Sequence, residues 1–259
     1  MLGITVLGSG SSGNSIIIHG REGDILVDAG FSLKELRKRM AAAEVEEGRL
    51  RAILVTHEHG DHAKGAGVVS RGLGLPVYTT PATARLLASK NRVGENVVLF
   101  NAGQTFTVGE FDIQPFSIPH DAVDPVGFTF TVPGFKLGVA TDIGYPTSVI
   151  CHHLAECDIL LLESNHDLTM LQQSERPWRL KQRIMGRQGH LNNTDSLMLL
   201  KRVLHAKTRH LIIGHTSREC NTYELVEALA AQSLMELGRQ DVVLRVARQE
   251  THLPTIWIA

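Results

Sequence analysis

Most of the residues that could bind a metal lie in one short segment. Residues 56–62 read Thr-His-Glu-His-Gly-Asp-His and directly follow the apolar run 52–55, a probable strand. Alternate residues of an extended chain point the same way, so the first two histidines can converge on one ion, and a turn at Gly60 re-aims the next two side chains. A solvated polar loop is the alternative, but three imidazoles and a carboxylate packed this tightly favour metal binding. The four candidate ligands are His57, His59, Asp61 and His62.

Three further donors each follow an apolar or alternating segment that reads as a strand. They are His120 after residues 111–119, Asp142 after 137–141, and His215 after 210–214. A single histidine or aspartate at a strand end is usually structural. Three of them in addition to the first cluster favour one dinuclear metal centre assembled from several strand ends.

The order of these residues resembles the five motifs of the metallo-β-lactamase superfamily. The matching positions are Asp28, the cluster from His57 to His62, His120, Asp142 and His215. The resemblance implies that His57, His59 and His120 hold one ion, that Asp61, His62 and His215 hold the other, and that Asp142 bridges them. Asp28 is then expected to orient the cluster rather than bind metal, although a turn or capping role explains it equally well from sequence.

Length and composition indicate one domain. No linker, charge block or repeat divides the 259 residues, and we expect a single domain over 1–259. The net charge of −1 excludes a globally basic nucleic-acid binder but permits a local basic patch. The three cysteines have no CxxC spacing, which indicates free thiols. No segment has the apolar length of a membrane span, so we expect a cytoplasmic protein without a membrane partner.

Strand-rich blocks alternate with single helices along the chain. Short strands separated by Gly-rich turns open the chain, a capping box at Ser32 starts a helix to about Ala43, and residues 97–139 are nearly all β. Further helices are expected after Thr80, Asn193 and Asn221. This pattern predicts an α/β fold, a four-layered αββα sandwich with the site where strand-end loops meet. The interval from Asp142 to His215 is too short for the cap of β-CASP nucleases, so we expect no such insertion.

A glycine-rich segment, Gly8-Ser9-Gly10-Ser11-Ser12-Gly13, fits the dinucleotide-binding pattern GxGxxG. That pattern must open a helix, whereas the β-branched residues 15–18 that follow predict a strand. We expect instead a loop that brings backbone N–H groups near a substrate phosphate, with Ser12 and Asn14 as candidate substrate contacts. A plain hairpin turn remains the alternative.

The expected cofactors are two divalent ions, Zn²⁺ or Mn²⁺, since imidazoles and carboxylates suit both. Such a pair lowers the pKa of a shared water to near neutrality, so the expected nucleophile is a metal-held hydroxide, with Asp61 counted among the catalytic residues. This chemistry cleaves lactams, thioesters, lactones and phosphodiesters alike. Residues around the ions must therefore select the substrate.

Two features favour a phosphodiester. His190 lies in Gly189-His190-Leu191-Asn192 before the last ligand, a position where related nucleases such as tRNase Z carry a non-ligand histidine, and it is our candidate general acid. Packing near a helix start is the structural alternative. Five cations without an intervening acid precede it and could bind a polyanion, although a solvated basic face is also common. With Asn192, the candidate substrate contacts here are Arg176, Arg179, Lys181, Arg183 and Arg187.

Several segments are similar to the bacterial YycJ/WalJ group of metallo-β-lactamase-fold exonucleases. They include residues 10–15, 119–128, 141–144, 163–167 and 215–217. The resemblance implies 5′-to-3′ degradation of DNA by a metal-dependent phosphodiesterase. The alternative is a small-molecule hydrolase of the same fold, namely a cyclic phosphodiesterase, lactonase or thioesterase. The native metal, RNA as a substrate, endonuclease action and the oligomeric state stay open.

Overall fold

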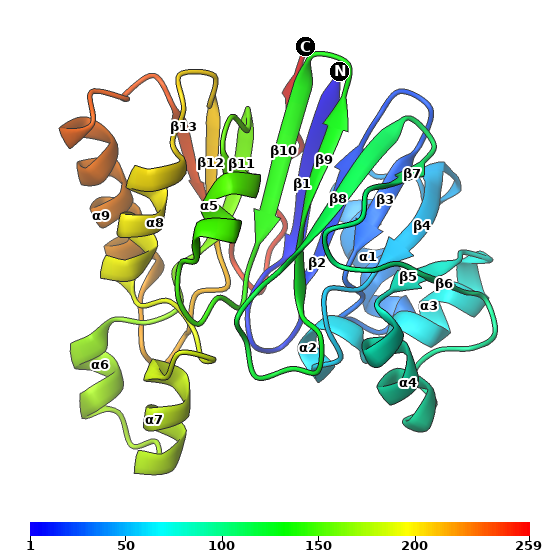
Figure 1. Ribbon diagram of the computed structural model, residues 1–259, viewed down its shortest axis with the longest axis horizontal. Coiled ribbons are helices and arrows are strands. Elements are labelled where there is room, and N and C mark those ends of the chain that lie inside the picture. The colour runs from blue at the N-terminus through cyan, green and yellow to red at the C-terminus, as the bar shows by residue number, and fades with distance from the viewer.

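Two seven-stranded sheets face each other between layers of helices in the computed structural model, which describes residues 1–259 (Figure 1). The first sheet has the order β14-β1-β2-β3-β4-β5-β6, and the second has the order β13-β12-β11-β10-β9-β8-β7. The αββα sandwich predicted from the sequence is confirmed.

The first sheet opens with the predicted meander, in which β1, β2 and β3 pair antiparallel, and continues with parallel strands. Its strands are β1 (Leu2–Gly8), β2 (Ser15–His19), β3 (Asp24–Val27), β4 (Leu50–Leu54), β5 (Val77–Thr79), β6 (Val97–Leu99) and β14 (Ile256–Ile258). The strand after the glycine-rich loop excludes the dinucleotide-binding alternative, because no helix begins there.

Helices of the first sheet cover its outer face, and α1 and α4 start where the sequence predicts. They are α1 (Leu33–Ala42), the 3₁₀ turn η1 (Glu47–Arg49), α2 (Gly60–Ala63), α3 (Ala66–Leu73) and α4 (Pro81–Ser89). The hydroxyl of Ser32 accepts from the backbone N–H of Glu35 at 3.2 Å and caps α1. Pro81 stands at the first helical position of α4, where its missing N–H costs nothing.

The second sheet is antiparallel from β7 to β10 and parallel from β10 to β13. Its strands are β7 (Phe106–Val108), β8 (Phe111–Ser117), β9 (Val126–Val132), β10 (Phe135–Ala140), β11 (Ile159–Glu163), β12 (His210–Gly214) and β13 (Val243–Val246). Its outer helices are α5 (Ser148–Leu154), α8 (Asn193–Val203) and α9 (Tyr223–Glu236). The longest helix, α9, has 14 residues, and no helix combines the length and apolar character needed to span a bilayer.

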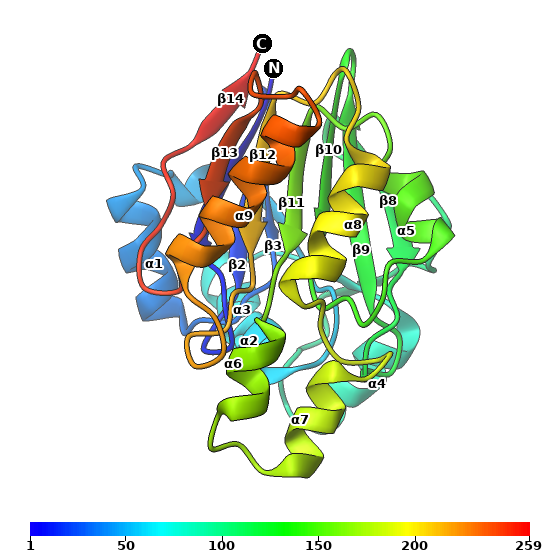
Figure 2. The ribbon, with the colours of Figure 1, turned by 90° about the vertical axis from the view of Figure 1, so that its left-hand side faces the viewer.

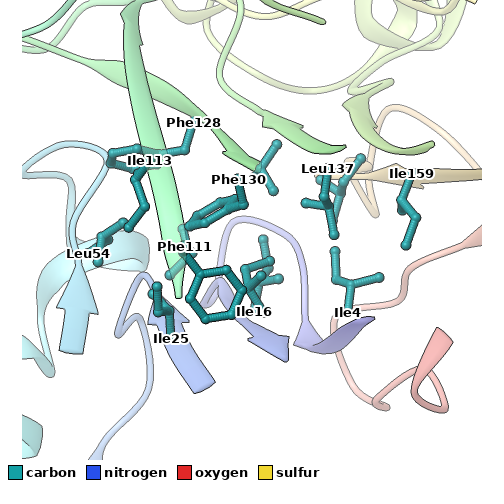
Figure 3. Packing of buried hydrophobic residues seen from close by; sticks show 14 of the residues in the cluster. Ile4, Ile16, Ile25, Leu54, Phe111, Ile113, Phe128, Phe130, Leu137 and Ile159 are labelled. Carbon is teal, nitrogen blue, oxygen red and sulfur yellow. The ribbon is translucent and has the colours of Figure 1, made fainter. Parts of the chain in front are cut away.

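The main core lies between the two sheets, where aliphatic side chains of the first meet phenylalanines of the second (Figure 3). Inner strands such as β2, β3 and β11 are buried on both faces, so they carry nearly continuous apolar runs. In β2, Ile16 and Ile18 point into this core, whereas Ile17 points outward against α1 and α3. The packing fixes the strand register and hence the positions of the strand ends.

A small helical lobe extends below the sandwich (Figures 1 and 2). It consists of α6 (Leu168–Gln173) and α7 (Trp178–Met185), which the sequence analysis did not predict. Leu171, Ile184 and Cys220 form a separate apolar cluster that anchors the lobe to the loop after β12. The lobe lies at the same end of the sandwich as α2, where the candidate ligands gather.

Candidate metal centre

The His-rich segment after β4 turns back on itself as predicted. The ring centroids of His57 and His59 are 4.6 Å apart, and those of His57 and His62 are 4.3 Å apart. The one-turn helix α2 carries Asp61 and His62 and aims both toward the centre. A strand, a turn and a single helical turn thus place four donors around one point.

The donors from the second sheet complete three groups whose ligand atoms lie within 4.8 Å of one another. His59 and His120, which come from different sheets, have ring centroids 5.0 Å apart. Nε2 of His62 lies 3.2 Å from Oδ2 of Asp142. These groups are His57, His59 and His120; Asp61, His62 and His215; and His57, His62 and Asp142. A fourth group, Asp142, Glu163, His190 and His215, comes from the second sheet alone. The structure therefore brings together every residue that the sequence assigned to the metals.

The donor set fits divalent ions. Nε2 of His57 and Nε2 of His215 are buried and make no hydrogen bond. A buried polar atom without a partner is unfavourable unless an ion or another ligand satisfies it. Imidazole nitrogens and carboxylate oxygens are ligands that Zn²⁺ and Mn²⁺ accept.

Three of the strand-end residues adopt left-handed backbone conformations. The φ angles are 61° for Asp28, 59° for Asp142 and 54° for His215. Residues with side chains rarely adopt this region, and such strain concentrates at functional sites. Each left-handed residue ends its strand abruptly and directs its side chain toward the centre or its supports.

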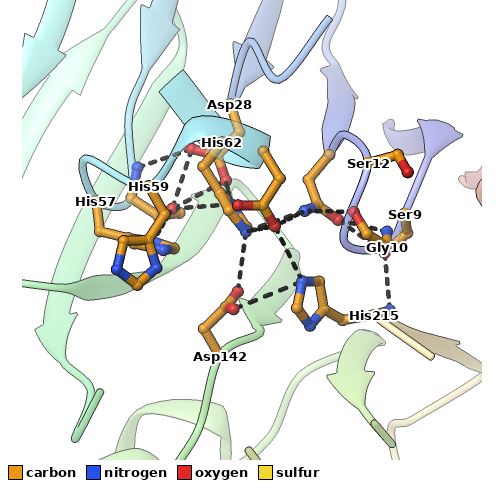
Figure 4. A network of polar contacts seen from close by, with 12 residues as sticks. Ser9, Gly10, Ser12, Asp28, His57, His59, His62, Asp142 and His215 are labelled. Carbon is orange, nitrogen blue, oxygen red and sulfur yellow. Dashed lines mark hydrogen bonds and ion pairs between the residues drawn. The ribbon is translucent and has the colours of Figure 1, made fainter. Parts of the chain in front are cut away.

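Hydrogen bonds to Nδ1 orient the imidazole rings of two candidate ligands. Oδ2 of Asp28 accepts from Nδ1 of His62 at 2.7 Å, and Oδ1 accepts from the backbone N–H of Thr56 at 2.9 Å (Figure 4). Nδ1 of His120 donates to the carbonyl of Gly189 at 3.0 Å. In both histidines the second nitrogen, Nε2, is left to face the centre. This geometry supports an orienting role for Asp28.

A buried glutamate joins the candidate acid to a candidate ligand. Oε1 of Glu163 accepts from Nδ1 of His190 at 2.7 Å and from Nδ1 of His215 at 3.0 Å, while Oε2 accepts from the backbone N–H of Ile143. Burial favours the neutral acid, but His190 and His215 outweigh it and lower the pKa of Glu163 to about 2. The sequence suggests Glu163 and His166, which follow the strand 158–162, as supports of the site or contacts to the substrate end, without deciding between these roles.

The centre holds opposite charges close together when no ion is bound. Burial lowers the pKa of His57 well below its usual value. Burial acts the same way on His62 and His215, but nearby carboxylates outweigh it, so the pKa of His62 rises well above its usual value and that of His215 to about 10. The pKa values of Asp61 and Asp142 fall below their usual range despite burial, because of these histidines. Cations are thus strongly favoured at this point.

The glycine-rich loop contacts the centre through Asn14. Its Oδ1 accepts from the N–H of Gly10 at 2.8 Å, and its Nδ2 lies 2.9 Å from Nε2 of His62. Asn14 is buried and faces ligands, so it supports the centre rather than presenting a free contact to substrate. Ser12 is exposed at the loop tip, and the neighbouring Ser11 lines the central cavity.

The basic run does not form the continuous row of free cations that we expected. Arg176 pairs with Glu219 at 2.9 Å, and Arg183 pairs with Asp121. Lys181 is buried, and its ammonium donates to the carbonyls of Gln172 and Ser174 at 2.7 and 2.6 Å, which stabilises the end of α6. Its charge is therefore unavailable to a substrate. The two exposed members without a carboxylate partner are Arg179 and Arg187, and Arg187 packs over the ring of Tyr145.

Asn192 also differs from the expectation of a free substrate contact. Its Oδ1 accepts from the N–H of Asp195 at 2.9 Å, and its Nδ2 donates to the carboxylate of Asp195 at 2.7 Å. The side chain is thus the N-cap of α8. The sequence predicts that this helix begins after Asn193, whereas α8 begins at Asn193, so the prediction missed the capping role of Asn192.

A cavity of about 210 Å³ opens onto the ligands. One wall carries His59, Asp61, Asp142 and His215, and α7 covers it with Leu180 and Arg183. His190 lines the same cavity. A substrate in this space contacts both the ligand side of the centre and the helical lobe.

A two-sheet sandwich with histidines and aspartates at its strand ends defines the metallo-β-lactamase class of metal-dependent hydrolases. The chain belongs to this superfamily, and residues 24–215 match the family described as the beta-lactamase superfamily domain.

Two bacterial proteins are similar over most of the chain. Exodeoxyribonuclease WalJ of Streptococcus pneumoniae is 35% identical over 236 residues, which cover 90% of this chain and 88% of that protein. Exodeoxyribonuclease YycJ of Bacillus anthracis is 34% identical over 241 residues, with coverage of 92% and 90%. The metallo-β-lactamase-fold protein YhfI from Bacillus subtilis superposes with a TM-score of 0.73 at 17% identity, covering 97% of this chain and 98% of that one. The last similarity concerns the fold alone.

Proposed function

We propose that this protein is a divalent-metal-dependent phosphodiesterase that removes nucleotides from the 5′ end of DNA. The observation that carries the proposal is the position of His190, which lines the ligand cavity and is held by Glu163. Similarity to two proteins named exodeoxyribonuclease, at 35% and 34% identity, supports DNA as the substrate.

Two ions, Zn²⁺ or Mn²⁺, fit the donor groups. His57, His59 and His120 would hold one, Asp61, His62 and His215 the other, and Asp142 would bridge them. When bound, such ions supply Lewis-acid stabilisation and a water acidic enough to act as nucleophile near neutral pH. Asp28 and the carbonyl of Gly189 keep the ligating nitrogens facing the ions.

His190 serves the leaving oxygen. Its Nδ1 donates to Glu163, so Nε2 is the nitrogen that can carry a proton into the cavity. The buried carboxylate fixes the orientation of the ring, as a general acid requires. His190 is partly exposed, with 21% of its side chain accessible, which allows contact with substrate.

The helical lobe and the glycine-rich loop would flank the bound DNA strand. Arg179 and Arg187 carry charge without a carboxylate partner, whereas Arg176 and Arg183 offer charges that are partly neutralised. Ser12 would face the strand from the opposite side of the cavity. We place this activity in the cytoplasm, where the DNA substrate of a bacterial nuclease is found.

The deciding experiment compares end-labelled substrates. Purified protein loaded with Mn²⁺ or Zn²⁺ is incubated with 5′-labelled and 3′-labelled duplex DNA, single-stranded DNA and RNA. Mononucleotides released from the 5′ end of DNA support the proposal. Internal cleavage, preference for RNA, or hydrolysis only of cyclic nucleotides, lactones or thioesters would exclude the proposed 5′-to-3′ DNA exonuclease activity.

A further inference from the structure

The three loops that carry His120, Asp142 and His190 also form a second cavity on their outer side. This cavity has a volume of about 680 Å³ and is lined by Pro119, Asp121, Tyr145, Arg183, Arg187 and Gln188, with Gly186. Each loop thus has an inner end at the metal centre and an outer end in the second cavity.

Backbone hydrogen bonds join these three loops to one another. The N–H of Asp121 donates to the carbonyl of Gln188 at 2.9 Å, and the N–H of Gly144 donates to the carbonyl of Pro119 at 2.8 Å. A Cβ atom at Gly144 would lie 2.2 Å from the carbonyl oxygen of Arg187, so only glycine permits this approach. The cavity is therefore part of the rigid frame of the centre.

A guanidinium and an aromatic ring form the wall of this cavity. Cζ of Arg187 lies 4.3 Å from the ring centroid of Tyr145. Arg187 is exposed and Tyr145 is partly exposed. Guanidinium planes and aromatic rings are the groups on which nucleobases stack, and this stacking tolerates any base.

The junction between the two cavities carries no free charge. Asp121 and Arg183 line both cavities and pair with each other. A phosphate at the junction would have to compete with Asp121 for Arg183. The planar, uncharged part of a nucleotide suits the passage and the Arg187 surface beyond it better than a second phosphate does.

We propose that Arg187, held in place by Tyr145, is a stacking site for a nucleobase close to the scissile phosphate. This inference rests on the proposed function, since it names the part of a nucleic acid that the outer cavity receives. The site recognises a base without selecting among the four, because it offers a plane and no hydrogen-bond pattern.

Matched variants separate stacking from charge and from structural damage. Arg187→Lys keeps the charge but removes the planar group, Tyr145→Ala removes the ring, and Tyr145→Phe keeps it. Each is assayed on oligonucleotides in which one of the nucleotides nearest the cleaved end is replaced by an abasic tetrahydrofuran analogue.

At one position the wild-type protein should cleave the substrate with a base about 10-fold more efficiently than the abasic one, the effect expected of a single stack. Arg187→Lys and Tyr145→Ala should abolish that preference, and Tyr145→Phe should retain it. The proposal would be overturned if the variants lost the same fraction of activity on substrates with and without the base, or if the wild-type protein showed no preference for a base at any position.

A binding measurement distinguishes this site from the nuclease activity itself. The metal-loaded protein is titrated with deoxyadenosine 5′-monophosphate and with 2-deoxyribose 5-phosphate, which lacks the base. Tighter binding of the nucleotide that depends on Arg187 supports the stacking site even if no DNA is cleaved. Equal affinity for the two ligands excludes it even if DNA is cleaved.

Discussion

Nδ1 of His190 lies 2.7 Å from Oε1 of Glu163, and the same oxygen accepts from Nδ1 of His215 at 3.0 Å. One buried carboxylate therefore supports both the proposed general acid and a candidate metal ligand. A substitution at Glu163 should affect the reaction through His190 and through His215, and the two effects can be measured separately.

Glu163→Gln should lower the rate about 10- to 100-fold, the usual effect of losing a partner that orients a metal ligand or acid. The amide has one acceptor oxygen in place of the carboxylate that both imidazoles share, so the orientation of both rings should be weakened. Steady-state kinetics together with metal analysis check this. In the double variant with His190→Ala, Glu163 can act only through His215. Any further loss of rate should then accompany weaker metal binding. A fully additive loss of rate at unchanged metal content would contradict the arrangement.

His190→Ala should keep both ions and lose roughly 10²- to 10⁴-fold in rate, the range for one general acid or oxyanion donor. A substrate with a sulfur leaving group needs less protonation and should recover much of that loss. Metal analysis beside the kinetics provides the control. A variant that loses an ion would show that His190 is a ligand.

Asp142→Ala should reduce metal occupancy and abolish turnover, because two donor groups meet at this carboxylate. Asp142 has a φ of 59°, a conformation that asparagine tolerates better than alanine. Asp142→Asn therefore separates loss of the charge from backbone strain. Two bound ions and full activity in both variants would refute the bridging assignment.

Metal affinity should rise with pH. The pKa of His215 is raised to about 10 and that of His62 lies well above its usual value, so both rings are protonated at neutral pH without metal. An ion must displace these protons, and log affinity should increase by about one unit per pH unit for each proton released. Calorimetric titrations in buffers of different ionisation enthalpy count the protons. A pH-independent affinity between pH 6 and 9 would show that the rings are neutral.

The basic run should separate into charges that bind DNA and one that stabilises the lobe. Replacing Arg179 by alanine should flatten the slope of log affinity against log salt by up to about 1 unit, whereas Arg187, whose proposed partner is an uncharged base, should contribute little to that slope. Lys181→Ala should instead cost about 1 to 3 kcal/mol of stability, because two carbonyls lose their donor. Thermal melts and salt titrations of both variants test the division, and a larger salt effect for Lys181 would reverse it.

The sequence predicted which residues meet at the strand ends, because each of these predictions needed only local information. A strand followed by a histidine or aspartate is visible in a few residues, and the sandwich forces those strand ends to meet. The same locality explains the confirmed starts of α1 and α4, where Ser32 and Pro81 mark the first turn.

Long-range pairing accounts for what the sequence did not show. The partners of Arg176 and Arg183 are Glu219 and Asp121, which are 43 and 62 residues away along the chain. Nothing near the basic run reveals these partners. The helices of the lobe have only 6 and 8 residues, too few for a helical period to stand out.

The two proposed ion sites each draw on both sheets. His57 and His59 follow β4 in the first sheet, whereas His120 follows β8 in the second, and Asp61 and His62 likewise meet His215 after β12. Each of the two proposed ion sites takes donors from both sheets, so bound ions would link the two layers, and chelation should loosen the docking of one sheet on the other. The order of assembly follows. During synthesis the chain can hold its metals only after β12 has left the ribosome and the two halves have closed on each other.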